Sequence, residues 1–188
     1  MNEPINAAQN TPTAKPVLND FVYKSVAKGL QFMFETLASE GIKGAGYEQP
    51  TSASTVTNKL SQHDRHAMAA WTQQTARKAL SADQWAWAVC AHDGRGEARH
   101  DAIDTLITAL GKLHNNRDML RDVIERELEL GETYAQSLPT IAKQTGASLR
   151  TTERVCSKVR AALAGIAEQS TAALQAAFYA KGYLRTAH

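Results

Sequence analysis

Apolar residues recur every three or four positions along most of the chain, which is the spacing of one face of an α-helix. The first such run predicts a helix before Gly41, with apolar positions at Val22, Val26, Leu30, Met33 and Leu37. The strongest run lies in the middle of the chain, at Ile103, Leu106, Ile107, Leu110 and Leu113. Strand-like alternation is nearly absent, so we predict an all-α fold in which helices pack as a bundle.

Composition divides the chain into five parts. Residues 1–16 are rich in Asn, Pro, Thr and Ala with almost nothing to bury, so we expect a disordered tail. The N-terminal helix falls within residues 17–40 and could be an appendage, because residues 41–57 are dense in Gly, Ser and Thr and are typical of a linker. We expect residues 58–131 to form a helical body and residues 132–188 to form a helix-turn-helix and a C-terminal helix.

The segment from residue 137 to residue 163 predicts two helices joined by a sharp turn. Ser137 is a good N-cap and Pro139 lies in the first turn, where its missing N–H does no harm, so a short helix should reach about Thr145. Gly146 can take the left-handed backbone that a reversal requires. Ser148 can then cap a second helix, which leads into a long alanine-rich helix.

The packing demands of such a hairpin are met by the residues present. Ala142 lies four residues before the turn glycine, where the two helices approach most closely, and it is small. Ile141, Ala147 and Val155 occupy inward positions that need apolar side chains. Thr152 is a tolerable substitute at a position that is more often aliphatic.

The words IAKQTGAS followed by RTTERVCSKVRAAL resemble the helix-turn-helix of sigma-factor region 4 and related phage and bacterial regulators. In outline, the order of helices is also similar to late-gene antitermination proteins of lambdoid phages, although the zinc-binding cysteines found in some of them are missing. The resemblance implies a sequence-specific, double-stranded DNA-binding transcription regulator of phage or mobile-element origin. The alternative is that the hairpin has only a structural role and that its basic face is simply exposed to water.

Charge is distributed unevenly in a way that fits a polyanionic partner. Residues 138–188 hold seven Lys or Arg and two acids, a net charge of +5, whereas residues 1–137 hold 14 basic and 17 acidic side chains, a net charge of −3. A basic segment behind an acidic body is expected when one part of a protein meets nucleic acid.

Three cations, Arg150, Arg154 and Lys158, are spaced four residues apart, so they project from one side of the second helix. Such a helix fits the major groove of DNA, where arginine bonds guanine through two N–H groups. By resemblance, the candidates for contact with base edges are Ser148, Leu149, Arg150, Thr151 and Arg154. The candidates for contact with phosphates are Lys143, Lys158 and Arg160.

The alanine-rich continuation of the second helix leaves two readings open. Its apolar face, at Leu163, Ile166, Ser170, Leu174 and Ala177, could form the seam of a homodimer. It could equally pack back on Trp71 or on the stripe that includes Ile103.

A second hypothesis comes from the tryptophans Trp71, Trp85 and Trp87. Exposed tryptophan and alanine-rich surfaces could make the chain a helical adaptor that binds a protein such as RNA polymerase, with the hairpin as scaffold. We expect no enzyme activity, cofactor or metal, since no P-loop, dinucleotide fingerprint or nucleophile elbow appears and the four candidate zinc ligands His63, His66, Cys90 and His92 lack a suitable spacing. Without a run long enough to span a membrane or a secretory signal, we expect a cytoplasmic protein.

Overall fold

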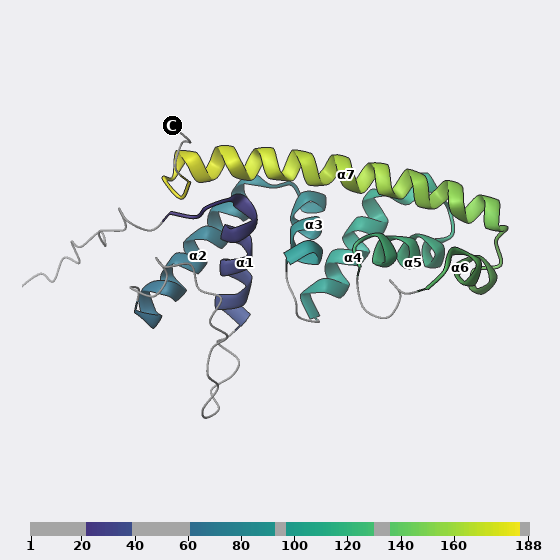
Figure 1. Cartoon of the computed structure of the whole chain (residues 1–188), viewed down its shortest axis with the longest axis horizontal. Helices are drawn as coiled ribbons and strands as arrows, with labels where there is room; N and C mark the ends of the chain where they lie inside the picture. Colours follow the sequence, from purple (N-terminus) through teal and green to yellow (C-terminus); the bar gives the residue numbers. More distant parts are fainter. Residues whose placement is uncertain (1–21, 39–60, 93–96, 130–135, 185–188) are drawn as a thin grey trace, which may run out of the picture.

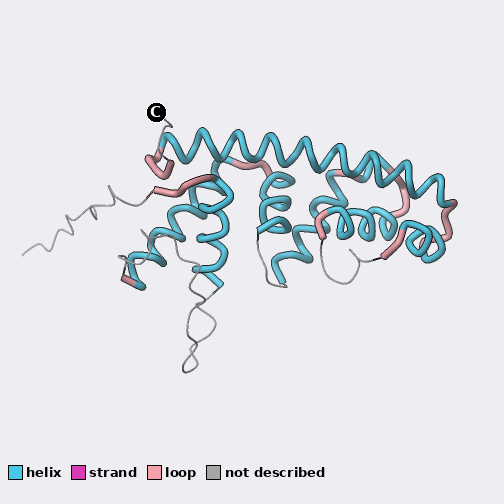
Figure 2. Tube along the Cα trace, in the orientation of Figure 1, coloured by secondary structure: helices cyan, strands magenta, loops and turns pink. Residues whose placement is uncertain are grey.

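The computed structural model describes residues 22–38, 61–92, 97–129 and 136–184, and over these residues the chain is helical (Figures 1 and 2). The helices are α1 (Val26–Ala38), α2 (Gln62–Ala79), α3 (Ala82–His92), α4 (Glu97–Ala109), the short 3-10 helix η3 (Gly111–Leu113), α5 (Arg117–Glu127), α6 (Leu138–Gln144) and α7 (Leu149–Ala180). The predicted all-α class is confirmed. The predictions for residues 1–16 and 41–57 concern segments that lie outside the described residues.

Helix α7 is the spine of the molecule. It has 32 residues, and at about 1.5 Å per residue it is a rod of about 48 Å. Figure 1 shows α1 and α2 beside its C-terminal half and α5 and α6 beside its N-terminal half, with α3 between them. The second helix of the predicted hairpin and the alanine-rich helix are therefore one continuous element.

Helix α1 belongs to the common core instead of forming an appendage. Its side chains Leu30 and Met33 are fully buried in the same cluster as residues of α2, α5 and α7. Gly29 brings α1 close to the end of α7, because a Cβ at this position would lie 2.9 Å from Cε2 of Phe178. The core thus runs through both ends of the molecule.

The segment before α1 ties the two ends of the described chain together. The backbone N–H of Tyr23 donates to the carbonyl of Tyr183 (2.8 Å), and Tyr23 forms an isolated β-bridge with Leu184. The Tyr23 hydroxyl also shares a buried hydrogen bond of 2.7 Å with Oγ1 of Thr72 on α2. Burial raises the pKa of the Tyr23 phenol, which therefore stays protonated and neutral in this core.

No helix in the described parts of the chain combines the length and the hydropathy that crossing a membrane requires.

Candidate nucleic-acid interface

The two helices of the candidate interface begin at serines. The Ser137 hydroxyl accepts the N–H of Thr140 (3.3 Å) at the start of α6, and the Ser148 hydroxyl accepts the N–H of Thr151 (3.1 Å) at the start of α7. Each serine therefore satisfies one of the N–H groups that a helix leaves free at its first turn. These are the two caps that the sequence predicts.

The turn between α6 and α7 depends on a left-handed glycine. Gly146 has a φ angle of 66°, which L side chains rarely adopt. Its N–H bonds the carbonyl of Lys143 (3.4 Å), and the N–H of Ala147 bonds the carbonyl of Ala142 (2.9 Å). This pair of bonds closes the C-terminus of α6 as a Schellman motif and fixes where α7 begins.

The inner surface of the hairpin is tightly packed. Ile141 and Ala142 of α6 and Val155 of α7 are buried, and α6 contacts α7 directly. Thr152 is also fully buried, and its hydroxyl donates to the carbonyl of Ser148 (3.2 Å). The hydroxyl is thereby satisfied, which explains how a polar residue is accepted at an otherwise apolar position.

Helix α5 supports the hairpin as a third helix. Its apolar face is buried, and α5 contacts both α6 and α7. At its N-terminus, Asn116 accepts the N–H of Met119 (3.0 Å) and donates from Nδ2 to the carbonyl of Thr145 (3.3 Å) at the end of α6. One side chain therefore caps α5 and holds the turn.

Most of the predicted site residues lie on the open side of this three-helix unit. Lys143, Ser148, Leu149, Arg150, Arg154 and Lys158 are exposed, and Thr151 is half-buried. Within the described residues, neither Arg150 nor Arg154 forms an ion pair. The first turns of α7 consequently present two unneutralised guanidinium groups to solvent.

Arg160 differs from the other members of the predicted set. Its Nε and Nη2 donate to Oε2 and Oε1 of Glu127 on α5, at 2.6 and 3.0 Å. The Cys156 thiol also donates to Oε1 of Glu127 (3.1 Å). This ion pair gives Arg160 a structural role between α5 and α7, and its contact with phosphate stays a prediction.

The environment of this link shifts two pKa values. The hydrogen bonds from Arg160 lower the pKa of the Glu127 carboxyl, because they favour its charged form more than partial burial opposes it. Burial, together with the hydrogen bond to Glu127, raises the pKa of the Cys156 thiol. The acid is thus held ionised and the thiol protonated.

Two exposed residues of the same face were missed by the sequence reasoning, which followed the cations. Glu153 and Ser157 lie four and eight residues after Leu149 and are exposed. At about 100° per residue, they fall between Leu149 and Arg150 around the axis of α7. The helical spacing from Leu149 was the signal that could have found them.

The apolar face of the C-terminal half of α7 packs within the chain. Leu163, Ser170 and Leu174 are buried, and this part of the molecule brings α7 into contact with α1, α2 and α3. Trp71 of α2 is 40% exposed. These three residues therefore pack back on the bundle, whereas Ile166 and Ala177 of the same face are half-buried, and a homodimer through α7 stays a prediction.

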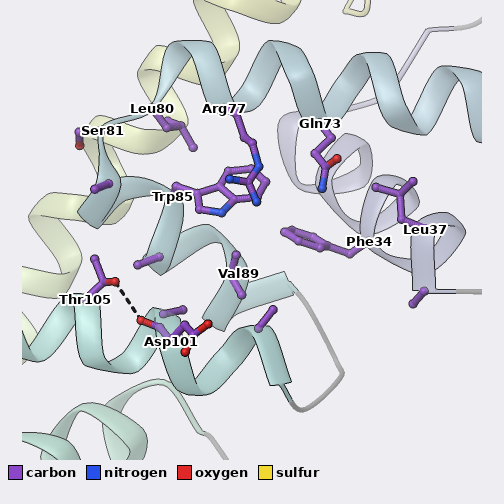
Figure 3. A pocket seen from close by; sticks show the side chains of 15 residues that line it. Phe34, Leu37, Gln73, Arg77, Leu80, Ser81, Trp85, Val89, Asp101 and Thr105 are labelled. Atoms are coloured by element: carbon purple, nitrogen blue, oxygen red, sulfur yellow. Dashed lines mark hydrogen bonds between the residues drawn. The ribbon is translucent and has the colours of Figure 1, made fainter. Parts of the chain in front are cut away.

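A groove of about 660 Å³ lies away from the hairpin, between α1, α2, α3 and α4. Figure 3 shows the Trp85 indole in this groove, with Phe34 beside it and Gln73 reaching in from α2. The Arg77 guanidinium lies 4.5 Å from the centre of the Trp85 ring. Trp85 and Trp87 are both half-buried.

No group of three or more His, Cys, Asp or Glu among the described residues is arranged to hold a metal ion. Comparisons with known protein families, with curated proteins and with solved structures gave no match. The resemblance to sigma-factor region 4 therefore stays a prediction, and the functional argument depends on the geometry of α5, α6 and α7.

Proposed function

We propose that this protein is a sequence-specific, double-stranded DNA-binding transcription regulator that reads the major groove with the N-terminal turns of α7. The observation that carries the proposal is the pair of exposed guanidinium groups of Arg150 and Arg154, which no acid among the described residues neutralises. The two groups lie close together on the exposed side of one helix, whereas Arg160 is paired with Glu127.

The contacts follow from where each side chain lies. Arg150 and Arg154 reach the O6 and N7 atoms of guanine, which accept two N–H groups from one guanidinium. Leu149 is 42% exposed and supplies an apolar contact, for which the thymine methyl group is the usual partner in the major groove. Lys143 and Lys158 bind phosphates and set the register of the helix on the duplex.

Three features of the role rest on the resemblance and on composition alone. The protein acts in the cytoplasm, it derives from a phage or mobile element, and its acidic body touches RNA polymerase. The net charge of −3 over residues 1–137 would keep that body off the DNA while the basic hairpin binds it.

Selection of bound duplexes from a random DNA pool, followed by gel shift at several salt concentrations, tests the proposal. We expect an enriched sequence and a steep fall of affinity with salt, because each neutralised phosphate contributes about 0.9 to the log–log slope. Arg150→Ala/Arg154→Ala should abolish enrichment. The matched control is Lys78→Ala/Lys181→Ala, which removes two exposed charges from elsewhere on the molecule. Equal DNA binding by the two double variants would disprove the mechanism.

The groove around Trp85 favours a second candidate function, that of an adaptor which binds RNA polymerase through apolar contacts. Phe34 and Trp85 line it, and aromatic side chains are enriched in the cores of protein interfaces. Trp85→Ala should then weaken binding to purified RNA polymerase while DNA affinity is unchanged. If Trp85→Ala binds RNA polymerase as the native protein does but loses affinity for DNA, only the DNA-binding function remains.

A further inference from the structure

Glu153 is an acid on the face that the proposed function assigns to DNA. It is exposed, and no described cation forms an ion pair with it. The carboxylate lies on α7 between Arg150 and Arg154 in the sequence. On a surface that only attracted phosphates, such a charge would weaken binding.

The helical positions place Glu153 between Leu149 and Arg150 on this face. It follows Leu149 by four residues and Arg150 by three, so it lies within about 60° of each around the axis of α7. The opposite side of the helix is closed, because Thr152, Val155 and Val159 are buried and this end of α7 packs on α5 and α6. A duplex that meets both Leu149 and Arg150 therefore also meets Glu153.

The major groove offers one kind of partner that suits a carboxylate there. A carboxylate accepts hydrogen bonds and donates none, and the donors on the floor of the groove are the exocyclic amino groups of cytosine (N4) and adenine (N6). A hydrogen bond to such a group offsets the loss of water and the repulsion by phosphates. Every base pair carries one such amino group, on one of its two bases, so discrimination depends on which base faces the carboxylate. Where thymine O4 or guanine O6 faces it, both costs remain.

We propose that Glu153 determines specificity by accepting a hydrogen bond from an exocyclic amino group of cytosine or adenine in the major groove. The inference rests on the proposed function and adds a residue outside the basic set. Glu153 would contribute little to affinity for DNA in general and much to the difference between right and wrong sites.

The test uses the full chain and a duplex selected as above. Each base pair of the selected site is replaced in turn, and the dissociation constants are measured for the native protein and for Glu153→Ala. At one position, replacing cytosine by thymine, or adenine by guanine, puts an oxygen where the amino group was. The native protein should lose at least about fivefold in affinity there. Glu153→Ala should show no loss at that position and should bind non-specific duplex more tightly than the native protein does.

Glu168→Ala is the matched control. It removes the same charge from an exposed site further along α7, so it should keep the position profile of the native protein. An unchanged profile for Glu153→Ala would overturn the inference and leave DNA binding standing. If the native protein selects no duplex at all, the proposed function fails and this inference falls with it. The base at the sensitive position distinguishes cytosine from adenine.

Discussion

Glu127 of α5 accepts two hydrogen bonds from the guanidinium of Arg160 of α7, at 2.6 and 3.0 Å. The acid is mostly buried, with 11% of its side chain exposed, whereas the arginine is 64% exposed. The pair therefore joins a mostly buried carboxylate of α5 to a mostly exposed guanidinium of α7. Lys158, two residues earlier on the same helix, is exposed and has no acidic partner among the described residues.

This difference predicts opposite effects of two neighbouring substitutions. Lys158→Ala should lower the salt slope of DNA binding by about one and leave the melting temperature unchanged, because the contact proposed for Lys158 is with phosphate and no described acid pairs with it. Arg160→Ala should keep the slope and lower the melting temperature, because Glu127 and Cys156 lose a partner. Gel shifts across a salt series and thermal unfolding measure the two effects. A reduced slope for Arg160→Ala would mean that Arg160 also contacts phosphate.

The lowered pKa of Glu127 predicts how stability depends on pH. Because the carboxyl releases its proton more readily in the folded state than in the unfolded one, its contribution is present above its ordinary value of 4.5 and is lost as pH falls through the folded value. Glu127→Gln carries no charge and should lose less stability across that acid range. Urea unfolding above and below pH 4.5 gives the comparison. Parallel pH curves for the two proteins would mean that the pair contributes nothing measurable.

Asn116 has two roles that can be separated. Asn116→Asp keeps an oxygen for the N–H of Met119 but removes the donor to the Thr145 carbonyl, whereas Asn116→Ala removes both. We expect the alanine variant to be destabilised by about 1 kcal/mol or more through the lost cap. The aspartate variant should fall between it and the native protein in chemical unfolding. If Asn116→Asp has the same free energy of unfolding as the native protein, the hydrogen bond to the Thr145 carbonyl contributes nothing measurable to stability.

Local signals in the sequence were enough to predict the hairpin. Ser137, Ser148 and Gly146 act within four residues of their own positions, so caps and a left-handed turn can be read without knowing the fold. The small Ala142 and the apolar Ile141 follow from the same local geometry.

Contacts between distant parts of the chain could not be predicted in this way. Glu127 and Arg160 are 33 residues apart, and nothing in either neighbourhood specifies the other, so Arg160 looked like one more free cation. The packing of α1 against α7 depends on Gly29, whose role is visible only once Phe178 lies beside it. Glu153 was not predicted as a site residue, because a sum of charges over a segment does not show where a single acid lies among the cations.

The turn glycine provides the last prediction. A Cβ at Gly146 would meet no atom within 4 Å, so any effect of Gly146→Ala arises from its φ angle of 66° and not from a clash. A left-handed backbone costs an L residue about 1–2 kcal/mol, and Asn tolerates it better than Ala. The free energy of unfolding should therefore fall for Gly146→Ala and fall less for Gly146→Asn.

Gly165 is the matched control for this substitution, because it also has open space around its Cα but lies inside α7 without a positive φ. Gly165→Ala should stabilise the protein by up to about 1 kcal/mol, since alanine is the better helix former. Urea unfolding of the three variants gives the order. If Gly146→Ala were as stable as Gly165→Ala, the chain would not reverse at residue 146 through a left-handed backbone, and the exposure of Arg150 on α7 would lose its structural basis.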